Sequence, residues 1–226
     1  GWPKRELVHE GASRRSHDVI GVGKQEKADL AWQWEMKNAI ACHRGTKFHL
    51  KMELKDLAEG DGVLNPFTEK KQKIVARPNT KWSDNATIGD RLEDLEDGYY
   101  PELIIFYYEG EIGVCGQVDR AWIWTDKDGV RWYYSDDWKT NYEKRNQASR
   151  DTFKEPLTHL PTTKDNTYSL QASIYGYMME LAGYKVAGTQ ITYIKDYKLE
   201  GCEQRELPYL EAEVKLMFQK YFSDED

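Results

Sequence analysis

The chain has 226 residues, of which 32 are lysine or arginine and 39 are aspartate or glutamate, giving a formal net charge of −7 at pH 7. This length is sufficient for one domain with a sizeable core. The sequence has no apolar run of about 18 residues and no charged-then-apolar leader, so neither a membrane span nor a secretory signal is expected, and a soluble, intracellular protein is.

The negative net charge is unusual for a protein that binds nucleic acid, because neutralising phosphates normally requires lysine and arginine. Two basic clusters can still line a local groove for DNA, and solvated loops with interleaved acids are the alternative interpretation. The clusters are Lys70, Lys71, Lys73 and Arg77, and Lys139, Lys144, Arg145, Arg150 and Lys154.

The N-terminal region predicts an arm followed by two helices. Residues 1–24 lack a sustained period, and a helix is expected over 24–41. Gly45 separates this helix from a second one, in which His49 and Glu53 share a face because they are four residues apart. Apolar residues at i, i+4 and i+7 of the second helix predict a stripe that faces the core: Leu50, Leu54 and Leu57.

The middle of the chain predicts a long connection and then a β-meander. Residues 59–82 are loop-like, and so long a connection in a compact domain is usually functional or mobile. A short helix near 88–95 and a strand over 103–108 are expected next. Two hairpin strands follow, over 112–124 and 130–139.

The turn between the hairpin strands sets their register. A three-residue loop that ends at Gly129, in the left-handed conformation, is a favoured connection and pairs Asp126 with Val130. Counting back in that register places Asp119 opposite Asp137, with about 4.5 to 5.5 Å between their Cβ atoms. A two-residue Asp-Gly loop would instead put the two carboxylates on opposite faces.

The hairpin carries a candidate metal centre. Asp119 and Asp137 offer hard oxygen ligands for Mg²⁺ or Mn²⁺, and Lys139 shares the face of Asp137 because it lies two residues further along the strand. A lysine there places positive charge beside an attacking water or a charged phosphorus centre. Asp136 points to the other face. On the hairpin alone, ordinary solvated side chains are the better explanation of both carboxylates, and residues elsewhere in the sequence favour the metal centre.

The C-terminal region predicts helix, strand and helix. Asn166 or Thr167 caps a helix that runs to about 182, where Gly183 stops it. Gln171 and Tyr175, one turn apart, lie beside its buried stripe. A strand over 186–194 and a final helix over 207–221 follow. The predicted buried stripe of the first helix is Leu170, Ile174, Met178 and Leu181, and that of the final helix is Leu210, Val214 and Met217.

Four segments in this order resemble the RecB-like branch of the PD-(D/E)XK nuclease superfamily: GTKFHLKME at 45–53, GQVD at 116–119, DWKT at 137–140 and QASIY at 171–175. The branch includes nuclease domains of bacterial recombination helicases, CRISPR-associated adaptation nucleases, and phage and mitochondrial single-strand exonucleases that serve DNA repair and recombination. The resemblance covers about residues 45 to 196. Its specificity comes from the order and spacing of the segments together.

The resemblance implies a metal centre with named ligands. His49 matches the histidine of the first motif, Asp119 the metal-binding aspartate, and Asp137 and Lys139 the D/E and K of the signature. The carbonyl of Trp138 would join Asp119 and Asp137 around one ion. Lys139 would orient or deprotonate the water, or neutralise charge in the transition state. Two further candidate acids are Glu53 and Glu102.

The same resemblance implies a substrate-binding helix. Gln171 and Tyr175 match the Q-x-x-x-Y pattern that this branch places beside the DNA. Several relatives also bind a [4Fe–4S] cluster through four cysteines. This chain has only Cys42, Cys115 and Cys202, so no iron–sulfur cluster is expected. Cys115 is expected to be a small buried side chain within its strand.

We therefore expect an α/β fold with a single domain over 25–226 and a restriction-endonuclease-like core. A central mixed sheet, built on the meander, would have the N-terminal helices on one face and the Gln171 helix on the other. The expected function is Mg²⁺- or Mn²⁺-dependent hydrolysis of DNA, as an exonuclease on single-stranded ends. The alternatives are an endonuclease of the same fold that cuts DNA or RNA, and a nucleic-acid-binding module without chemistry.

Overall fold

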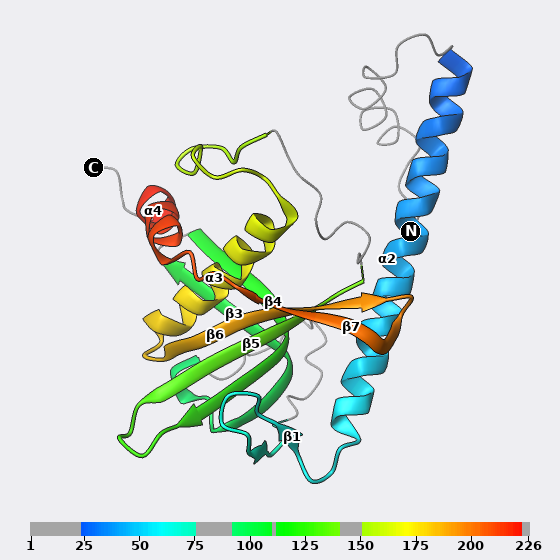
Figure 1. The fold of residues 1–226 in the computed structure, drawn as a ribbon. Helices are drawn as coiled ribbons and strands as arrows, with labels where there is room; N and C mark the ends of the chain where they lie inside the picture. Colours follow the sequence, from blue (N-terminus) through cyan, green and yellow to red (C-terminus); the bar gives the residue numbers. More distant parts are fainter. Residues whose placement is uncertain (1–23, 76–91, 110–111, 141–150, 223–226) are drawn as a thin grey trace, which may run out of the picture. The chain divides into compact units, whose positions relative to one another are not determined.

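A computed structural model describes residues 24–75, 92–109, 112–140 and 151–222 (Figure 1). The chain forms two compact units, Gly1–Leu50 and Lys51–Asp226. Almost all of the predicted arm, the first half of the predicted helix at 88–95 and part of the predicted loop at 59–82 lie outside the described residues. Within the part of the chain that is described, no helix combines the length and apolar character needed to cross a bilayer.

Helix α2, Lys24–Leu57, is one continuous helix. The predicted break at Gly45 is wrong, because a glycine inside a helix costs only about 1 kcal/mol relative to alanine. The helix continues through Gly45 from Arg44 to Thr46 without a break. Thr46, the next residue, donates a hydrogen bond from Oγ1 to the carbonyl of Cys42 at 3.0 Å.

The leucine stripe predicted to face the core is also wrong. Leu50, Leu54 and Leu57 are 53%, 57% and 37% exposed, whereas Met52 and Asp56 are buried. The carboxylate of Asp56 accepts a hydrogen bond from the Tyr99 hydroxyl and lies 3.5 Å from Nε of Arg120. A buried polar contact therefore sets which side of the last turns faces the sheet, and the period of the apolar residues does not reveal it.

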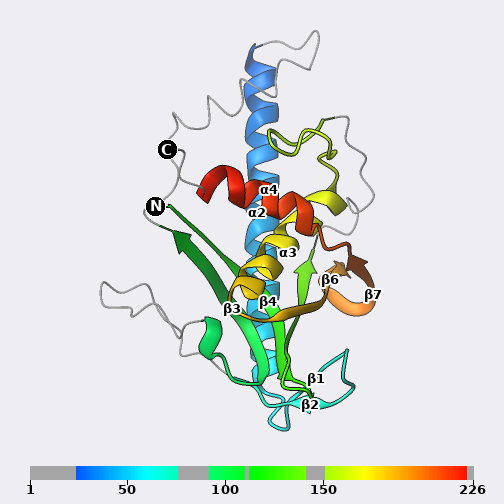
Figure 2. The ribbon, with the colours of Figure 1, turned by 90° about the vertical axis from the view of Figure 1, so that its left-hand side faces the viewer.

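The central sheet of the second unit has the order β3-β4-β5-β6-β7 (Figures 1 and 2). The first three strands form the predicted antiparallel meander, and helix α3 then connects β5 to the parallel strand β6. The predicted α/β fold with a mixed sheet flanked by helices is confirmed. The strands are β3, Gly98–Glu109; β4, Ile112–Thr125; β5, Arg131–Lys139; β6, Lys185–Lys195; and β7, Lys198–Leu207.

Strand β7 was not predicted from the sequence. It pairs with β6 through a tight turn in which Asp196 and Tyr197 have φ values of 52° and 57°. That geometry usually selects asparagine or glycine, so the turn carries no sequence signal here. Leu207 ends β7, and the final helix α4 begins later than predicted, as Glu211–Phe222. The other elements outside the prediction are β1, Val63–Leu64, and β2, Lys71–Gln72. A 3-10 helix at Leu92–Asp94 lies in the described part of the helix predicted near 88–95.

Helix α3, Lys164–Leu181, packs on one face of the sheet with α4 beside it (Figure 2). Its N-cap is Thr163, whose hydroxyl accepts the amide of Asn166 at 3.1 Å, and not Asn166 or Thr167 as predicted. Gly183, at φ +89°, follows the helix as predicted. Leu170 and Met178 are buried, but Leu181 is 46% exposed.

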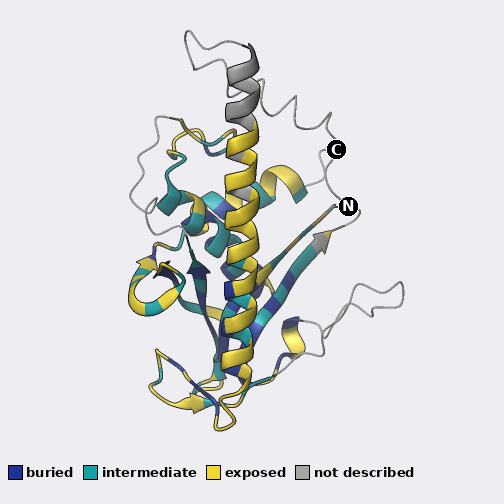
Figure 3. Cartoon of the chain, turned by 90° about the vertical axis from the view of Figure 1, so that its right-hand side faces the viewer, coloured by how far each residue is buried: buried dark blue, intermediate teal, exposed yellow. Residues whose placement is uncertain are grey.

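The core lies between α3 and the sheet, where the strands carry most of the buried residues (Figure 3). Its members include Leu103, Ile105, Ile123, Tyr133 and Met179. A smaller aromatic cluster on the opposite face contains Tyr99, Trp122 and Tyr134. The last turns of α2 reach this second face through Asp56. Within the second unit, α3 therefore packs on one face of the sheet, and residues 51–57 of α2 contact the other through Asp56.

Candidate metal centre

The hairpin register is as predicted. The amide of Asp126 donates to the carbonyl of Val130 at 2.9 Å, and Gly129 has a φ of 78°. Arg120 pairs with Asp136 in the ladder between β4 and β5. The next position in the same register places Asp119 opposite Asp137. The choice of the three-residue loop over the two-residue loop is confirmed.

Strands β3 and β4 are irregular where Glu102 faces Asp119. The ladder pairs Pro101 with Arg120 and Leu103 with Val118, which leaves these two acids opposite each other. Side chains of a regular strand return to one face every two residues. Here, buried residues three apart lie in the same core cluster in both strands: Tyr100 and Leu103, and Val118 and Ala121. The alternation therefore slips by one residue at the two acids.

Glu102 adopts a strained backbone conformation at this irregularity. Its φ of 52° lies in the left-handed region, which costs a non-glycine residue about 1 to 3 kcal/mol. Such strain occurs most often at binding and catalytic sites. The strained residue carries a carboxylate next to a second carboxylate, which makes Glu102 a stronger ligand candidate than its sequence position alone suggests.

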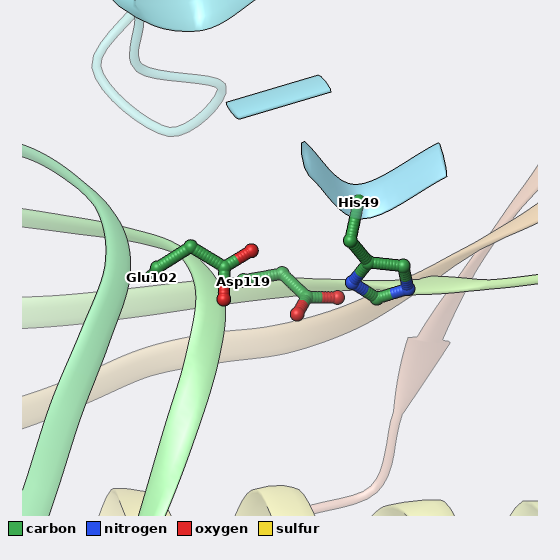
Figure 4. Close-up of side chains that lie close together, drawn as sticks. All are labelled: His49, Glu102 and Asp119. Atoms are coloured by element: carbon green, nitrogen blue, oxygen red, sulfur yellow. The ribbon is translucent and has the colours of Figure 1, made fainter. Parts of the chain in front are cut away.

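Glu102 and Asp119 form a pair of ligand candidates on adjacent strands (Figure 4). They offer carboxylate oxygens within 4.8 Å of each other. Asp119 is only 9% exposed and accepts the backbone amide of Trp138 at 2.6 Å. His49, also labelled in Figure 4, comes from α2 and belongs to the first unit, whereas Glu53, on the next turn, is half-buried in the second. Carboxylate oxygens such as those of Glu102 and Asp119 suit Mg²⁺ or Mn²⁺.

Asp137 and Lys139 form an ion pair on β5. Both side chains are largely buried, with exposures of 20% and 17%. Burial disfavours the charged amine, but Asp137, with a smaller contribution from Asp119, outweighs this and raises the pKa of Lys139 above its usual range. Lys139 therefore carries its positive charge at neutral pH, paired with Asp137 and within electrostatic range of Asp119.

Helix α3 closes over Asp137 and Lys139. A cavity of only about 10 Å³ separates them from three side chains of the helix, Tyr168, Gln171 and Tyr175. That volume is close to the minimum that one water molecule requires. Nε2 of Gln171 donates to the Tyr175 hydroxyl at 2.9 Å, so the two predicted substrate-binding residues contact each other.

Gly116 explains how the GQVD segment and the Gln171 helix fit together. A Cβ atom at this position would lie 2.2 Å from Cε1 of Tyr175 and 2.5 Å from its hydroxyl. Only glycine leaves room for this ring against β4. Two segments that are separate in the sequence therefore meet through one residue without a side chain.

Asp136 points away from the candidate centre, as predicted, but it is not a solvated side chain. It is 2% exposed, accepts Thr192 at 2.9 Å and lies 3.1 Å from Nη1 of Arg120. Burial, partly offset by Arg120, raises its pKa to about 6. Arg120 also stacks on Trp122 and Trp138, 4.8 and 4.9 Å from their rings. This cluster lines a second cavity, of about 320 Å³, on the face opposite α3.

The predicted basic groove is described only in part. Lys71 and Lys73 form exposed ion pairs with Asp61 and Glu96. Exposed pairs of this kind contribute little to stability and remain solvated. Arg77, Lys144, Arg145 and Arg150 lie outside the described residues.

The three cysteines are all exposed, so the prediction that Cys115 is buried is wrong. Residues 113, 115 and 117 of β4 are exposed in alternation, because this stretch lies beyond the paired part of β5. Replacing Cys42, Cys115 and Cys202 with serine is expected to leave both activity and stability largely unchanged, since no buried thiol is removed. Iron and acid-labile sulfide assays, with nuclease assays on the triple variant, test this. Stoichiometric iron in the wild type would contradict it.

The chain matches no protein-family model, and no curated protein matches it.

Proposed function

We propose that the protein is a metal-dependent DNA nuclease that hydrolyses phosphodiester bonds with Mg²⁺ or Mn²⁺. One observation supports the proposal: the β4–β5 hairpin has the register in which Asp119 falls opposite Asp137, and Asp137 and Lys139 form an ion pair on β5. Gln171 and Tyr175 lie over the same strands. The RecB-like resemblance names the same residues independently of the fold.

Asp119 and Asp137 would hold the ion with the carbonyl of Trp138. The amide of Trp138 already fixes Asp119 at 2.6 Å. Glu102, on the strained part of β3, is a further candidate ligand that the structure suggests. His49, on α2, is a candidate ligand that the resemblance suggests. When bound, such an ion supplies Lewis-acid stabilisation of the negative charge on the phosphodiester.

Lys139 would neutralise charge in the transition state. Of the three roles that the sequence leaves open, this one needs only the ammonium group that the structure places beside Asp137. The side chains of Asp137 and Lys139 lie beside the water-sized cavity under α3, which gives an attacking water polar partners. A covalent enzyme intermediate is not required.

We further propose that the substrate is single-stranded DNA with free ends. The close cover of α3 over Asp137 and Lys139 leaves too little room for a duplex from that face. Tyr175 presents an aromatic ring near the centre, and stacking of a base on such a ring is worth about 1 to 3 kcal/mol. A threaded single strand can use this contact.

The substrate proposal is tested by comparing end-labelled linear and covalently closed circular single-stranded DNA of one sequence with Mn²⁺. We expect the linear strand to be degraded from its ends and the circle to resist. Tyr175→Ala should raise KM about 5- to 100-fold, the equivalent of one lost stacking contact, while Mn²⁺ affinity stays unchanged. Rapid cutting of the circle would refute the end requirement and favour an endonuclease. Equal cutting of RNA would refute specificity for DNA.

A further inference from the structure

We infer that Tyr168 is a positioning residue that holds the Lys139 ammonium group at the reacting centre. The inference rests on the proposed nuclease function. Nζ of Lys139 lies 4.8 Å from the centroid of the Tyr168 ring. A ring face attracts a cation over that distance, most strongly where water is excluded. Tyr168 is outside the segments that resemble the nuclease branch.

Helix α3 aims Tyr168 at the same place as Gln171 and Tyr175. The three residues are spaced i, i+3 and i+7, so they share one face of the helix. All three line the small cavity that contains Asp137 and Lys139. Tyr168 is the member of this face that contacts the lysine, whereas Gln171 and Tyr175 contact each other.

The ring of Tyr168 is held from three elements. Tyr193 on β6, which is fully buried, meets it edge to face with 6.5 Å between centroids. Arg205 on β7 lies 5.5 Å from the Tyr193 ring and binds both carboxylate oxygens of Asp165 at 2.9 and 3.0 Å. Asp165 lies three residues before Tyr168 in α3. The ring therefore has a fixed position before any substrate arrives.

The Tyr168 ring can hold the Lys139 ammonium group when Asp137 is bound to a metal ion. Asp137 is a proposed metal ligand, so an ion and Lys139 compete for the same carboxylate oxygens. A lysine released from this pair has a long flexible stem and many rotamers. The face of an aromatic ring is no ligand for a hard cation, so Tyr168 can retain the ammonium group while Asp137 serves the metal.

Tyr168→Leu is expected to lower kcat on linear single-stranded DNA about tenfold, as expected for one desolvated cation–π contact. KM and Mn²⁺ affinity should stay the same, because neither the substrate nor the ion touches this ring in the proposed arrangement. Tyr168→Phe keeps the ring face and should restore kcat to near the wild-type value. Tyr168→Met is a second ringless variant that can fill the same space.

A second measurement needs no substrate. Trace acetylation of the folded protein, quantified by mass spectrometry, reports how freely the Lys139 amine moves, with exposed Lys198 as the internal standard. Labelling of Lys139 should rise in Tyr168→Leu and Tyr168→Met and remain low in Tyr168→Phe. Urea unfolding of each variant checks that the change is local.

The outcomes separate the inference from the proposed function. An active wild type with unchanged kcat in the ringless variants would overturn the role of Tyr168 and leave the nuclease proposal standing. A rise in KM alone would make Tyr168 a substrate contact and also overturn it. If the wild type cleaves no DNA while labelling still rises, the nuclease function fails and the contact is only structural.

Discussion

Asp137→Ala and Lys139→Ala are each expected to reduce DNA cleavage by about 10²- to 10³-fold, the scale of losing one preorganised polar group at a reacting centre. The two variants should differ in metal binding. Asp137 is a proposed ligand, so its removal should weaken Mn²⁺ binding measured by calorimetry. Lys139 is not a ligand, and its removal should preserve binding or strengthen it, because the ion no longer competes with the ammonium group for Asp137.

The companion variants keep this test free of folding effects. Asp137→Ala leaves a largely buried amine without its carboxylate, which is destabilising by itself. Asp137→Asn and Lys139→Met retain size and are the better matched pair. Asp128→Ala, on the exposed hairpin loop, removes a carboxylate of the same hairpin and should remain fully active. Full activity of either Asp137→Asn or Lys139→Met would eliminate the proposed centre.

Asp136→Ala is a poor control, although it appears ideal from the sequence. Strand alternation correctly places Asp136 on the opposite face from Asp137, which suggests a solvated and replaceable side chain. The structure instead buries it against Arg120 and Thr192. Its removal would leave Arg120 with fewer partners in a buried position, so lost activity in this variant would report unfolding as readily as chemistry.

The hairpin was predictable because one local rule fixes it. Loop length and Gly129 determine the pairing of Asp126 with Val130, and the later pairs, as far as Arg120 with Asp136, follow from counting residues along the two strands. The position of Asp119 relative to Asp137 is therefore a consequence of a few residues close in sequence. The position of helix α3 after the meander was predictable for a similar reason. Gly183, which ends the helix, is a signal that can be recognised from the neighbouring residues alone.

The features that were missed depend on contacts between distant segments. The side of the last turns of α2 that faces the sheet is fixed by the hydrogen bond between Asp56 and Tyr99, which lies 43 residues away in the sequence. The slip at Glu102 and Asp119 breaks the alternation on which strand predictions depend. The packing of Tyr175 on Gly116 is likewise invisible in either segment alone. Periodicity reports the average face of an element and fails where one polar or strained residue decides the packing.

Asp119→Asn is expected to weaken Mn²⁺ binding more than about 100-fold, because loss of even an outer-shell partner of a metal ligand costs about 10- to 100-fold. Cleavage should fall to background at any Mn²⁺ concentration that leaves this variant unloaded. The asparagine carbonyl oxygen can still accept the Trp138 amide, so the free energy of unfolding should change little. Asp119→Ala would leave that buried amide unpaired and is less informative. Wild-type Mn²⁺ affinity in Asp119→Asn would remove this residue from the metal centre.

Glu102→Gly provides the matched comparison on the opposite strand. Glycine adopts a φ of 52° without strain, so the substitution relieves about 1 to 3 kcal/mol. The greater chain entropy of glycine in the unfolded state offsets about 0.5 to 1 kcal/mol of this gain. Stability in urea should therefore be unchanged or increased, while Mn²⁺ affinity falls because a carboxylate next to Asp119 is lost. Unchanged or increased stability together with reduced Mn²⁺ affinity would mean that the strained backbone of Glu102 serves metal binding and not the stability of the fold. A variant with unchanged metal affinity would make Glu102 a structural irregularity only, and would leave Asp119, Asp137 and the Trp138 carbonyl as the candidate ligands on the sheet.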